Sequence, residues 1–291
     1  MRHCVVILFF LFFIWVDVSH AEKIKVIASI TPLADFVKQV GGEKVEVKLL
    51  LPPGASPHTY EPTPKAIKDI SDAKVFIKIG AGLEFWAEKI IQSSGNKQLI
   101  TINSSSGVSL FKQHKEHHLH VSSGVDPHIW LDPLIAIDIV AKIEKTLTEI
   151  DPKNAGVYKQ KASVFREKLS NLDKEISARV RTFKIKEYVT FHSAWNYFSK
   201  RYGLKVAGAI EESPGREPGP KQIEKINKEI NRIGNKVVFV EPQFNPKIAE
   251  AIARESNAKV LYLDPIGGQK GRETYIDMMR YNIAVMESVM K

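Results

Sequence analysis

Three histidines in this 291-residue chain lie in short, proline-containing motifs that are widely separated along the sequence. They are His58 in P-P-G-A-S-P-H-T-Y-E-P, His128 in D-P-H-I-W-L-D-P and His192 in V-T-F-H-S-A-W. A carboxylate, Asp264 in L-Y-L-D-P, comes late in the chain. Imidazole nitrogens suit zinc and its neighbours, and a carboxylate can complete a tetrahedral shell. These four residues therefore predict a transition-metal site assembled from the whole length of the chain.

The first 21 residues have the features of a secretory signal peptide. Arg2 precedes an apolar run at 5–16, and Ser19 and Ala21 supply the small residues of an A-x-A-like cleavage site. The run is shorter than the ~20 apolar residues of a membrane-spanning helix. The single cysteine, Cys4, precedes the run and cannot be a lipid-bearing residue at the cleavage site. We therefore expect a cysteine-free mature chain exported to a bacterial periplasm.

Composition favours a globular protein and gives no sign of nucleic-acid binding. The net charge is +9 and 44% of residues are hydrophobic, near the globular average. Lysines are mixed with acidic residues along amphipathic segments, and a basic block of the kind found in nucleic-acid-binding arms is absent from the sequence. The net positive charge is therefore interpreted as a solvated basic surface. Separately, the mature chain is expected to be a monomer.

Short β-branched runs alternate with helical patterns in both halves of the chain, which is typical of α/β units with mostly parallel sheets. Strands are predicted at 24–29, 45–50, 75–79, 98–102, 188–191, 205–209, 237–240 and 260–263. Helices are predicted at 33–40, 64–70, 83–91, 195–202, 221–233, 246–256 and 273–289. The expected fold class is therefore α/β, with two lobes.

A longer helix is predicted between the halves, over residues 155–181. Val157, Phe165, Leu169 and Ile176 approximate a 3.6-residue stripe, and Asp151 precedes the segment as a start signal. At 1.5 Å per residue it makes a rod of roughly 40 Å. The predicted organisation is a signal peptide at 1–21, an N-terminal lobe at 22–132, a linker region with the long helix at 133–181, and a C-terminal lobe at 182–291.

Residues 103–125 depart from this alternation, and no regular structure is expected there. The segment is rich in serine and lacks periodicity, and such a long loop is usually functional or disordered. It contains the run Q-H-K-E-H-H-L-H, with His114, His117, His118 and His120. Histidine-rich tracts can hold metal loosely. A secondary metal-collecting loop and a solvated insert without a role both remain open.

Residues 22–291 resemble the metal-specific periplasmic binding proteins of ABC importers, the zinc and manganese uptake family. The motifs that carry the resemblance are I-A-S-I-T-P-L-A-D at 27–35, P-P-G-A-S-P-H-T-Y-E-P at 52–62, D-P-H-I-W-L-D-P at 126–133, D-P-K-N-A-G-V-Y at 151–158, T-F-H-S-A-W-N-Y-F at 190–198 and L-D-P-I-G-G at 263–268. The second and third motifs together are highly specific. The resemblance implies two lobes joined by a backbone helix, one metal between them, and a membrane permease as partner.

The resemblance also implies a ligand set. His58 and His128 match the histidines of the N-terminal lobe, His192 matches a third ligand that is histidine in zinc-preferring members, and Asp264 matches the C-terminal carboxylate. Some zinc importers place a glutamate beside the first histidine, but here that residue is Pro57. Zn²⁺ is the expected cargo, and Mn²⁺ or Fe²⁺ is the alternative.

An enzyme is the competing class. Three histidines on zinc with an open fourth position could activate water, as in a secreted zinc hydrolase. The sequence contains neither an H-E-x-x-H helix nor a paired-metal cluster, and Asp264 would close the shell. A binding protein without catalytic residues is therefore preferred.

Several residues near the expected ligands have predicted supporting roles. Trp130 and Trp195 are expected to pack, and Glu61 and Asp132 are expected to orient imidazoles as hydrogen-bond acceptors. The segment E-E-S-P-G-R-E-P-G-P at 211–220 is expected to face the other lobe or the transporter.

Overall fold

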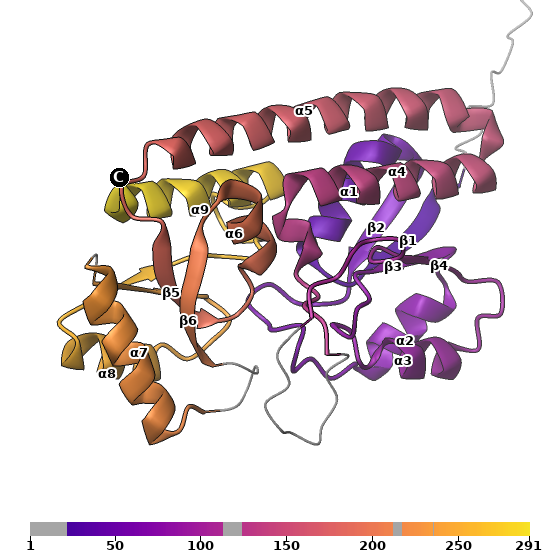
Figure 1. Ribbon diagram of the computed structural model, residues 1–291. Helices are drawn as coiled ribbons and strands as arrows, with labels where there is room; N and C mark the ends of the chain where they lie inside the picture. Colours follow the sequence, from indigo (N-terminus) through magenta and orange to yellow (C-terminus); the bar gives the residue numbers. More distant parts are fainter. Residues whose placement is uncertain (1–21, 113–123, 212–216, 235) are drawn as a thin grey trace, which may run out of the picture.

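Two parallel sheets organise the chain into two α/β lobes beneath one long helix that lies along both of them (Figure 1). The computed structural model describes residues 22–112, 124–211, 217–234 and 236–291. The four histidines of the run Q-H-K-E-H-H-L-H, for which both interpretations are open, lie outside the described residues. The predicted fold class is confirmed.

The two sheets have four strands each and the same strand order. The N-terminal order is β2-β1-β3-β4, and the C-terminal order is β6-β5-β7-β8. All registered neighbours are parallel, so the carboxyl ends of the strands meet at one edge of each sheet. The strands are β1 (Ile24–Ala28), β2 (Val45–Leu49), β3 (Val75–Lys78), β4 (Ile100–Asn103), β5 (Glu187–His192), β6 (Lys205–Glu211), β7 (Val237–Val240) and β8 (Lys259–Tyr262).

Helices cover both faces of each sheet. The helices are α1 (Thr31–Gly41), α2 (Pro64–Ser71), α3 (Ala87–Ser94), α4 (Pro133–Ile150), α5 (Ala155–Arg181), α6 (Asn196–Tyr202), α7 (Pro220–Ile233), α8 (Lys247–Glu255) and α9 (Tyr275–Met290). Alternate residues of β1 show the layering, because Ile27 packs in a cluster with α2 and α3 while Val26 and Ala28 join the central core. In β5, Val189 likewise packs with α7 and α8, and Tyr188 joins the central core.

The central core is continuous between the lobes. One cluster of buried residues includes side chains from β1, from α5 and from α9. The predicted long helix is confirmed as α5, Ala155–Arg181, whose 27 residues lie along both lobes (Figure 1). Its buried stripe includes Tyr158, Phe165 and Leu172, and the Tyr158 hydroxyl donates to Asp151 at 2.6 Å.

Ion pairs fix α5 to the C-terminal lobe. Arg201 of α6 donates to both carboxylate oxygens of Asp173 in α5, at 2.9 and 2.8 Å. Arg179 of α5 donates twice to Glu287 of α9, at 2.9 and 2.6 Å. A bidentate arginine pair holds orientation as well as distance, so α5 cannot rotate freely against the lobe.

Two regions differ from the sequence prediction. The sequence predicts no helix within residues 133–150 of the linker region, but they form the 18-residue helix α4. Asp132 caps this helix by accepting from the backbone N–H of Leu134. The irregular segment expected at 103–125 is ordered at both ends. Asn103 closes β4, the Ser104 side chain is buried, and Lys112 pairs with Val125 in an antiparallel bridge.

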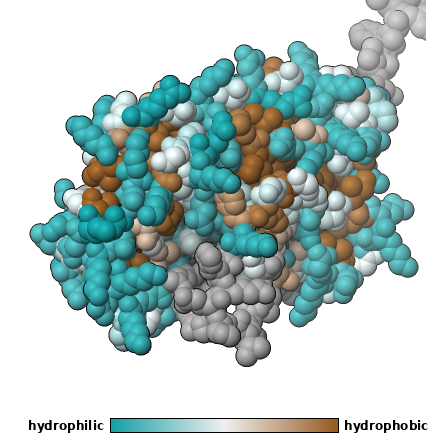
Figure 2. Space-filling model, in the orientation of Figure 1, coloured by the Kyte–Doolittle hydropathy of each residue, from teal (hydrophilic) through white to brown (hydrophobic). Residues whose placement is uncertain are grey.

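The described surface is predominantly hydrophilic on the face drawn in Figure 2, with hydrophobic residues in separate areas between polar ones. The large hydrophobic side chains most exposed among the described residues are Phe85, Val164 and Tyr262. Within the same residues, no helix combines the length and hydropathy needed to cross a membrane.

Candidate metal centre

His58 lies in the loop that leaves the carboxyl end of β2. Backbone bonds from Leu50 to Ala28 and from Leu51 to Ser29 continue the strand pairing past the end of β2. The His58 backbone N–H then donates to Ser56 Oγ at 3.3 Å. The loop is thus held at the sheet edge, and His58 as a whole residue is half-buried.

His128 comes directly before the short 3₁₀ helix at Ile129–Leu131 and is 3% exposed. Asp126 orients it twice, accepting from the His128 backbone N–H at 2.9 Å and lying 2.7 Å from Nδ1. The other Asp126 oxygen accepts from Asn196 Nδ2 of α6 at 2.9 Å. Because a carboxylate only accepts, His128 carries its proton on Nδ1 and presents a lone pair at Nε2.

His192 is the last residue of β5 and is 3% exposed. Its Nδ1 lies 3.2 Å from Oε1 of Glu241, the residue that follows the neighbouring strand β7. Trp195 Nε1 donates to the same glutamate oxygen at 3.2 Å. Glu241 therefore favours a proton on His192 Nδ1, which leaves Nε2 free to bind a cation.

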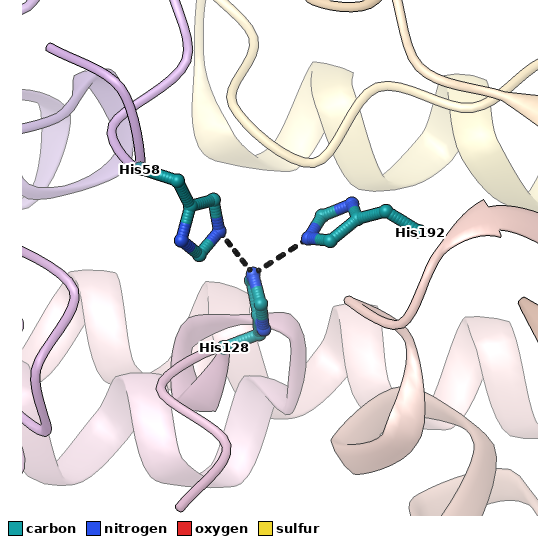
Figure 3. A group of neighbouring side chains, drawn as sticks. All are labelled: His58, His128 and His192. Carbon is teal, nitrogen blue, oxygen red and sulfur yellow. Dashed lines mark hydrogen bonds between the residues drawn. The ribbon is translucent and has the colours of Figure 1, made fainter. Parts of the chain in front are cut away.

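The three imidazoles converge through their Nε2 atoms (Figure 3). His128 Nε2 lies 3.1 Å from His58 Nε2 and 3.2 Å from His192 Nε2, and the possible ligand atoms of the three all lie within 4.8 Å of one another. Nitrogens on a tetrahedral zinc are about 3.3 Å apart, given Zn–N bonds of about 2.0–2.1 Å. The one lone pair on His128 Nε2 cannot accept hydrogen bonds from His58 and His192 at the same time. The Nε2 lone pairs of all three rings can, however, point at one cation. The donor set therefore fits a divalent metal ion.

Burial keeps two of these imidazoles neutral. It lowers the pKa of His58 well below its ordinary value of 6.5, and the neighbouring His128 and His192 lower it further. Burial also lowers the pKa of His128, although Asp126 acts in the opposite direction. Neutral imidazole is the form that binds a metal, so both residues are ready to bind near neutral pH.

Asp264 lies just beyond β8 and is fully buried. Its neighbour Pro265 accepts from Trp130 Nε1 at 2.7 Å, and its own Oδ1 accepts from Gln243 Nε2 at 3.1 Å. Among the described residues its Oδ2 has no hydrogen-bond partner, and it lies 3.3 Å from Arg272 Nη1. Asp264 is outside the set of ligand atoms within 4.8 Å of one another, which consists of His58, His128 and His192.

The expected supporting residues are partly wrong. Asp132 caps α4 and Glu61 is exposed, while the carboxylates beside the imidazoles belong to Asp126 and Glu241. The D-P-H spacing could have identified Asp126, since a carboxylate two residues before a histidine can reach its ring. Glu241 has no comparable local signal because it depends on β5 lying next to β7.

Three other expectations concern residues around the centre. Trp130 and Trp195 are fully buried in the central core, as predicted. Glu211 is buried and lies opposite His192 in the β5–β6 register. Residues 212–216 of the expected interlobe or transporter-facing segment lie outside the described residues.

Comparison with known proteins gives matches along nearly the whole chain. Residues 26–289 match the family described as "Zinc-uptake complex component A periplasmic". The chain is 32% identical over 281 residues to the high-affinity zinc uptake system protein ZnuA of Bacillus subtilis, covering 92% of this chain and 88% of that protein.

Two further comparisons agree with that match. The chain is 30% identical over 286 residues to the zinc-binding protein AdcA of Streptococcus pyogenes, covering 91% of this chain but only 55% of AdcA. A crystal structure of ZnuA superimposes with a TM-score of 0.83 at 28% identity, covering 93% of this chain and 100% of that one.

Proposed function

Because this chain belongs to the ZnuA family of zinc-uptake binding proteins, we propose that it captures Zn²⁺ between its lobes through His58, His128, His192 and Asp264. The chain is the zinc-binding component of a high-affinity ABC uptake system, and the family is not enzymatic. The strongest support for this ligand set is the convergence of three Nε2 atoms. Those of His58 and His192 lie 3.1 and 3.2 Å from that of His128.

Asp264 is the proposed fourth ligand. Support comes from its burial, from an Oδ2 atom that has no hydrogen-bond partner within the described ranges, and from two links to the centre. Gln243, two residues after Glu241, donates a hydrogen bond to Asp264 Oδ1. Trp130, two residues after His128, donates one to the carbonyl of Pro265. A shift of the carboxylate toward the three Nε2 atoms would complete a shell of three nitrogens and one oxygen.

Zinc is the proposed cargo, and Mn²⁺ or Fe²⁺ is the alternative. Three imidazoles with one carboxylate suit a borderline cation, whereas Mn²⁺ is better served by more oxygen ligands. Buried carboxylates at Asp126, Glu241 and Asp264 also make the centre attractive to a divalent cation.

The proposed cycle consists of capture and delivery. The ion exchanges its water for imidazole and carboxylate ligands in a centre where His128 and His192 are nearly inaccessible to solvent. The loaded protein then docks on the membrane permease of its uptake system, which accepts the ion. We propose that export uses residues 1–21 as a signal peptide and that the mature protein acts in the periplasm as a monomer.

Metal titration of the mature chain tests this function. Zinc is expected to bind one-to-one and to displace Mn²⁺ and Fe²⁺ in competition, and His128→Ala is expected to abolish high-affinity binding while the thermal transition stays cooperative. Glu61→Ala, at an exposed position in the same motif as His58, is the matched control and should bind as the wild type does. Native affinity in His128→Ala would remove His128 from the site, and tighter retention of Mn²⁺ would overturn the choice of zinc.

A further inference from the structure

The two oxygens of Asp264 have different surroundings. Oδ1 accepts three hydrogen bonds, from Gln243 Nε2 at 3.1 Å and from the backbone N–H groups of Ile266 at 3.0 Å and Gly267 at 2.9 Å. Oδ2 is buried and accepts no hydrogen bond from the part of the chain that the structure describes. The carboxylate is thus anchored by one oxygen, and the other is available to a cation.

The positively charged side chain of Arg272 lies beside Asp264 Oδ2. Its Nη1 lies 3.3 Å from Oδ2, and its side chain is 13% exposed. Since Asp264 is fully buried, removing this positive charge would leave a buried carboxylate without a charged partner, which is strongly unfavourable.

The guanidinium is held in place by other contacts. Nη2 donates to Gln269 Oε1 at 2.6 Å, and the guanidinium carbon lies 4.6 Å from the centre of the Tyr281 ring. Backbone bonds from Arg272 to Gln269 and from Gly268 to Arg272 close the loop that carries it. These contacts do not involve Asp264, so the arginine keeps partners when Oδ2 turns to another cation.

We infer that Arg272 is an exchangeable partner of Asp264 that competes with the bound metal ion for Oδ2 and so limits how tightly zinc is held. This inference rests on the proposed role of Asp264 as fourth ligand. An ion that takes Oδ2 must draw the oxygen away from the arginine, and it then has a fixed positive charge nearby. When the ion leaves, the arginine pairs with the carboxylate again. Arg272 thereby lowers the barrier to delivery at the expense of affinity.

The sign of a mutational effect separates competition from a structural role. A residue that only supports the site weakens metal binding when it is removed, whereas a competitor strengthens binding. Arg272→Met is therefore expected to tighten zinc binding by about tenfold, in line with the lower range of couplings measured for close charge pairs. Most of the change should appear as slower dissociation, measured by transfer of zinc to a chelator in stopped flow.

Three single variants and one double variant complete the test. Lys270→Met removes the same charge from an exposed position in the same loop, and Arg272→Lys retains a charge at the pairing position. Both should bind zinc within about threefold of the wild type. Asp264→Asn should weaken zinc binding, and adding Arg272→Met to it should change the affinity by less than about threefold.

The outcomes distinguish failure of the inference from failure of the ligand assignment. If Asp264→Asn weakens zinc binding while Arg272→Met leaves it unchanged or weaker, competition is wrong. If Asp264→Asn binds zinc normally, the fourth ligand is wrong and the inference falls with it. A second measurement, which does not depend on Arg272→Met, is the NMR signal of the Arg272 Nε–H group. The signal is identified by its absence from the spectrum of Arg272→Lys. It should shift on zinc addition in the wild type and stay in place in Asp264→Asn, and no shift in the wild type would also overturn competition.

Discussion

The two lobes share one strand order but contribute to the metal centre in different ways. The N-terminal part supplies His58 and His128 from loops, and His58 is the partly exposed ligand. The C-terminal lobe supplies His192 from the end of a strand, with Glu241 after the neighbouring strand and Asp264 after the next.

One topology can therefore provide two kinds of ligand support. At the C-terminal lobe, parallel strands place one imidazole and two carboxylates along the edge where ligands bind in α/β sheets. The N-terminal part fixes its loops through local hydrogen bonds that the backbone N–H groups of His58 and His128 donate to Ser56 and Asp126. The C-terminal lobe therefore contributes most of the fixed charge, and the N-terminal part contributes most of the nitrogen ligands.

The largest expected effect contrasts His192 with His58. His192→Ala should weaken zinc binding by about a thousandfold, the share of one ligand in the free energy of the proposed four-ligand zinc site. His58→Ala should lose about tenfold less, because water can replace a partly exposed ligand more easily than a buried one. Competition against a zinc chelator measures both. Equal losses would contradict the contrast between the loop ligand and the strand ligand.

The carboxylates beside the imidazoles should give the next largest effect. Glu241→Gln and Asp126→Asn each should weaken zinc binding by about 10–100-fold, because the carboxylate fixes the tautomer and orientation of the metal-binding ring. Isothermal titration on each variant, with far-UV circular dichroism as the folding control, provides the measurement. Wild-type affinity in Glu241→Gln would mean that the end of β5 alone positions His192.

The pH dependence is a smaller effect that concerns the N-terminal ligands. Because the pKa values of His58 and His128 are lowered, zinc affinity should change little from pH 8 down to their ordinary pKa of 6.5 and fall only below it. In that lower range the unfolded chain binds protons that the folded metal-free chain does not, so the free energy of unfolding also decreases as pH falls. Chelator competition and urea unfolding across this range test the two statements. A steep loss of affinity above pH 6.5 would contradict them.

The smallest effect on zinc is expected at Asp132, which the sequence placed beside an imidazole and the structure places at the start of α4. Asp132→Ala should lower the free energy of unfolding by about 1 kcal/mol through loss of the helix cap and leave zinc affinity unchanged. Urea unfolding and zinc titration of the same preparation separate the two effects. A large loss of zinc affinity would restore Asp132 as a support for the ligands.

The sequence predicts those features that depend on local periodicity. Helix α5 begins and ends where its apolar stripe does, because that stripe faces a single core. Helix α4 was missed because half-buried Ile135 and Ile137 lie outside its buried stripe and blur the period. The histidines were found because each sits in an unusual motif. The pairing of His192 with Glu241 was missed because it depends on which strands are neighbours, which periodicity does not encode.

The return of α9 to the N-terminal lobe has a consequence for folding during export. The backbone N–H of Tyr275 donates to Asp35 at 2.9 Å, and its hydroxyl donates to the Trp130 carbonyl at 2.7 Å. A chain that emerges N-terminus first can form the N-terminal sheet early. The two hydrogen bonds of Tyr275 form only after helix α9 has emerged. A translocation intermediate without α9 would lack core side chains of that helix and the Asn282 side chain that bonds the backbone of Asp264. Zinc capture is therefore expected to follow completion of the polypeptide.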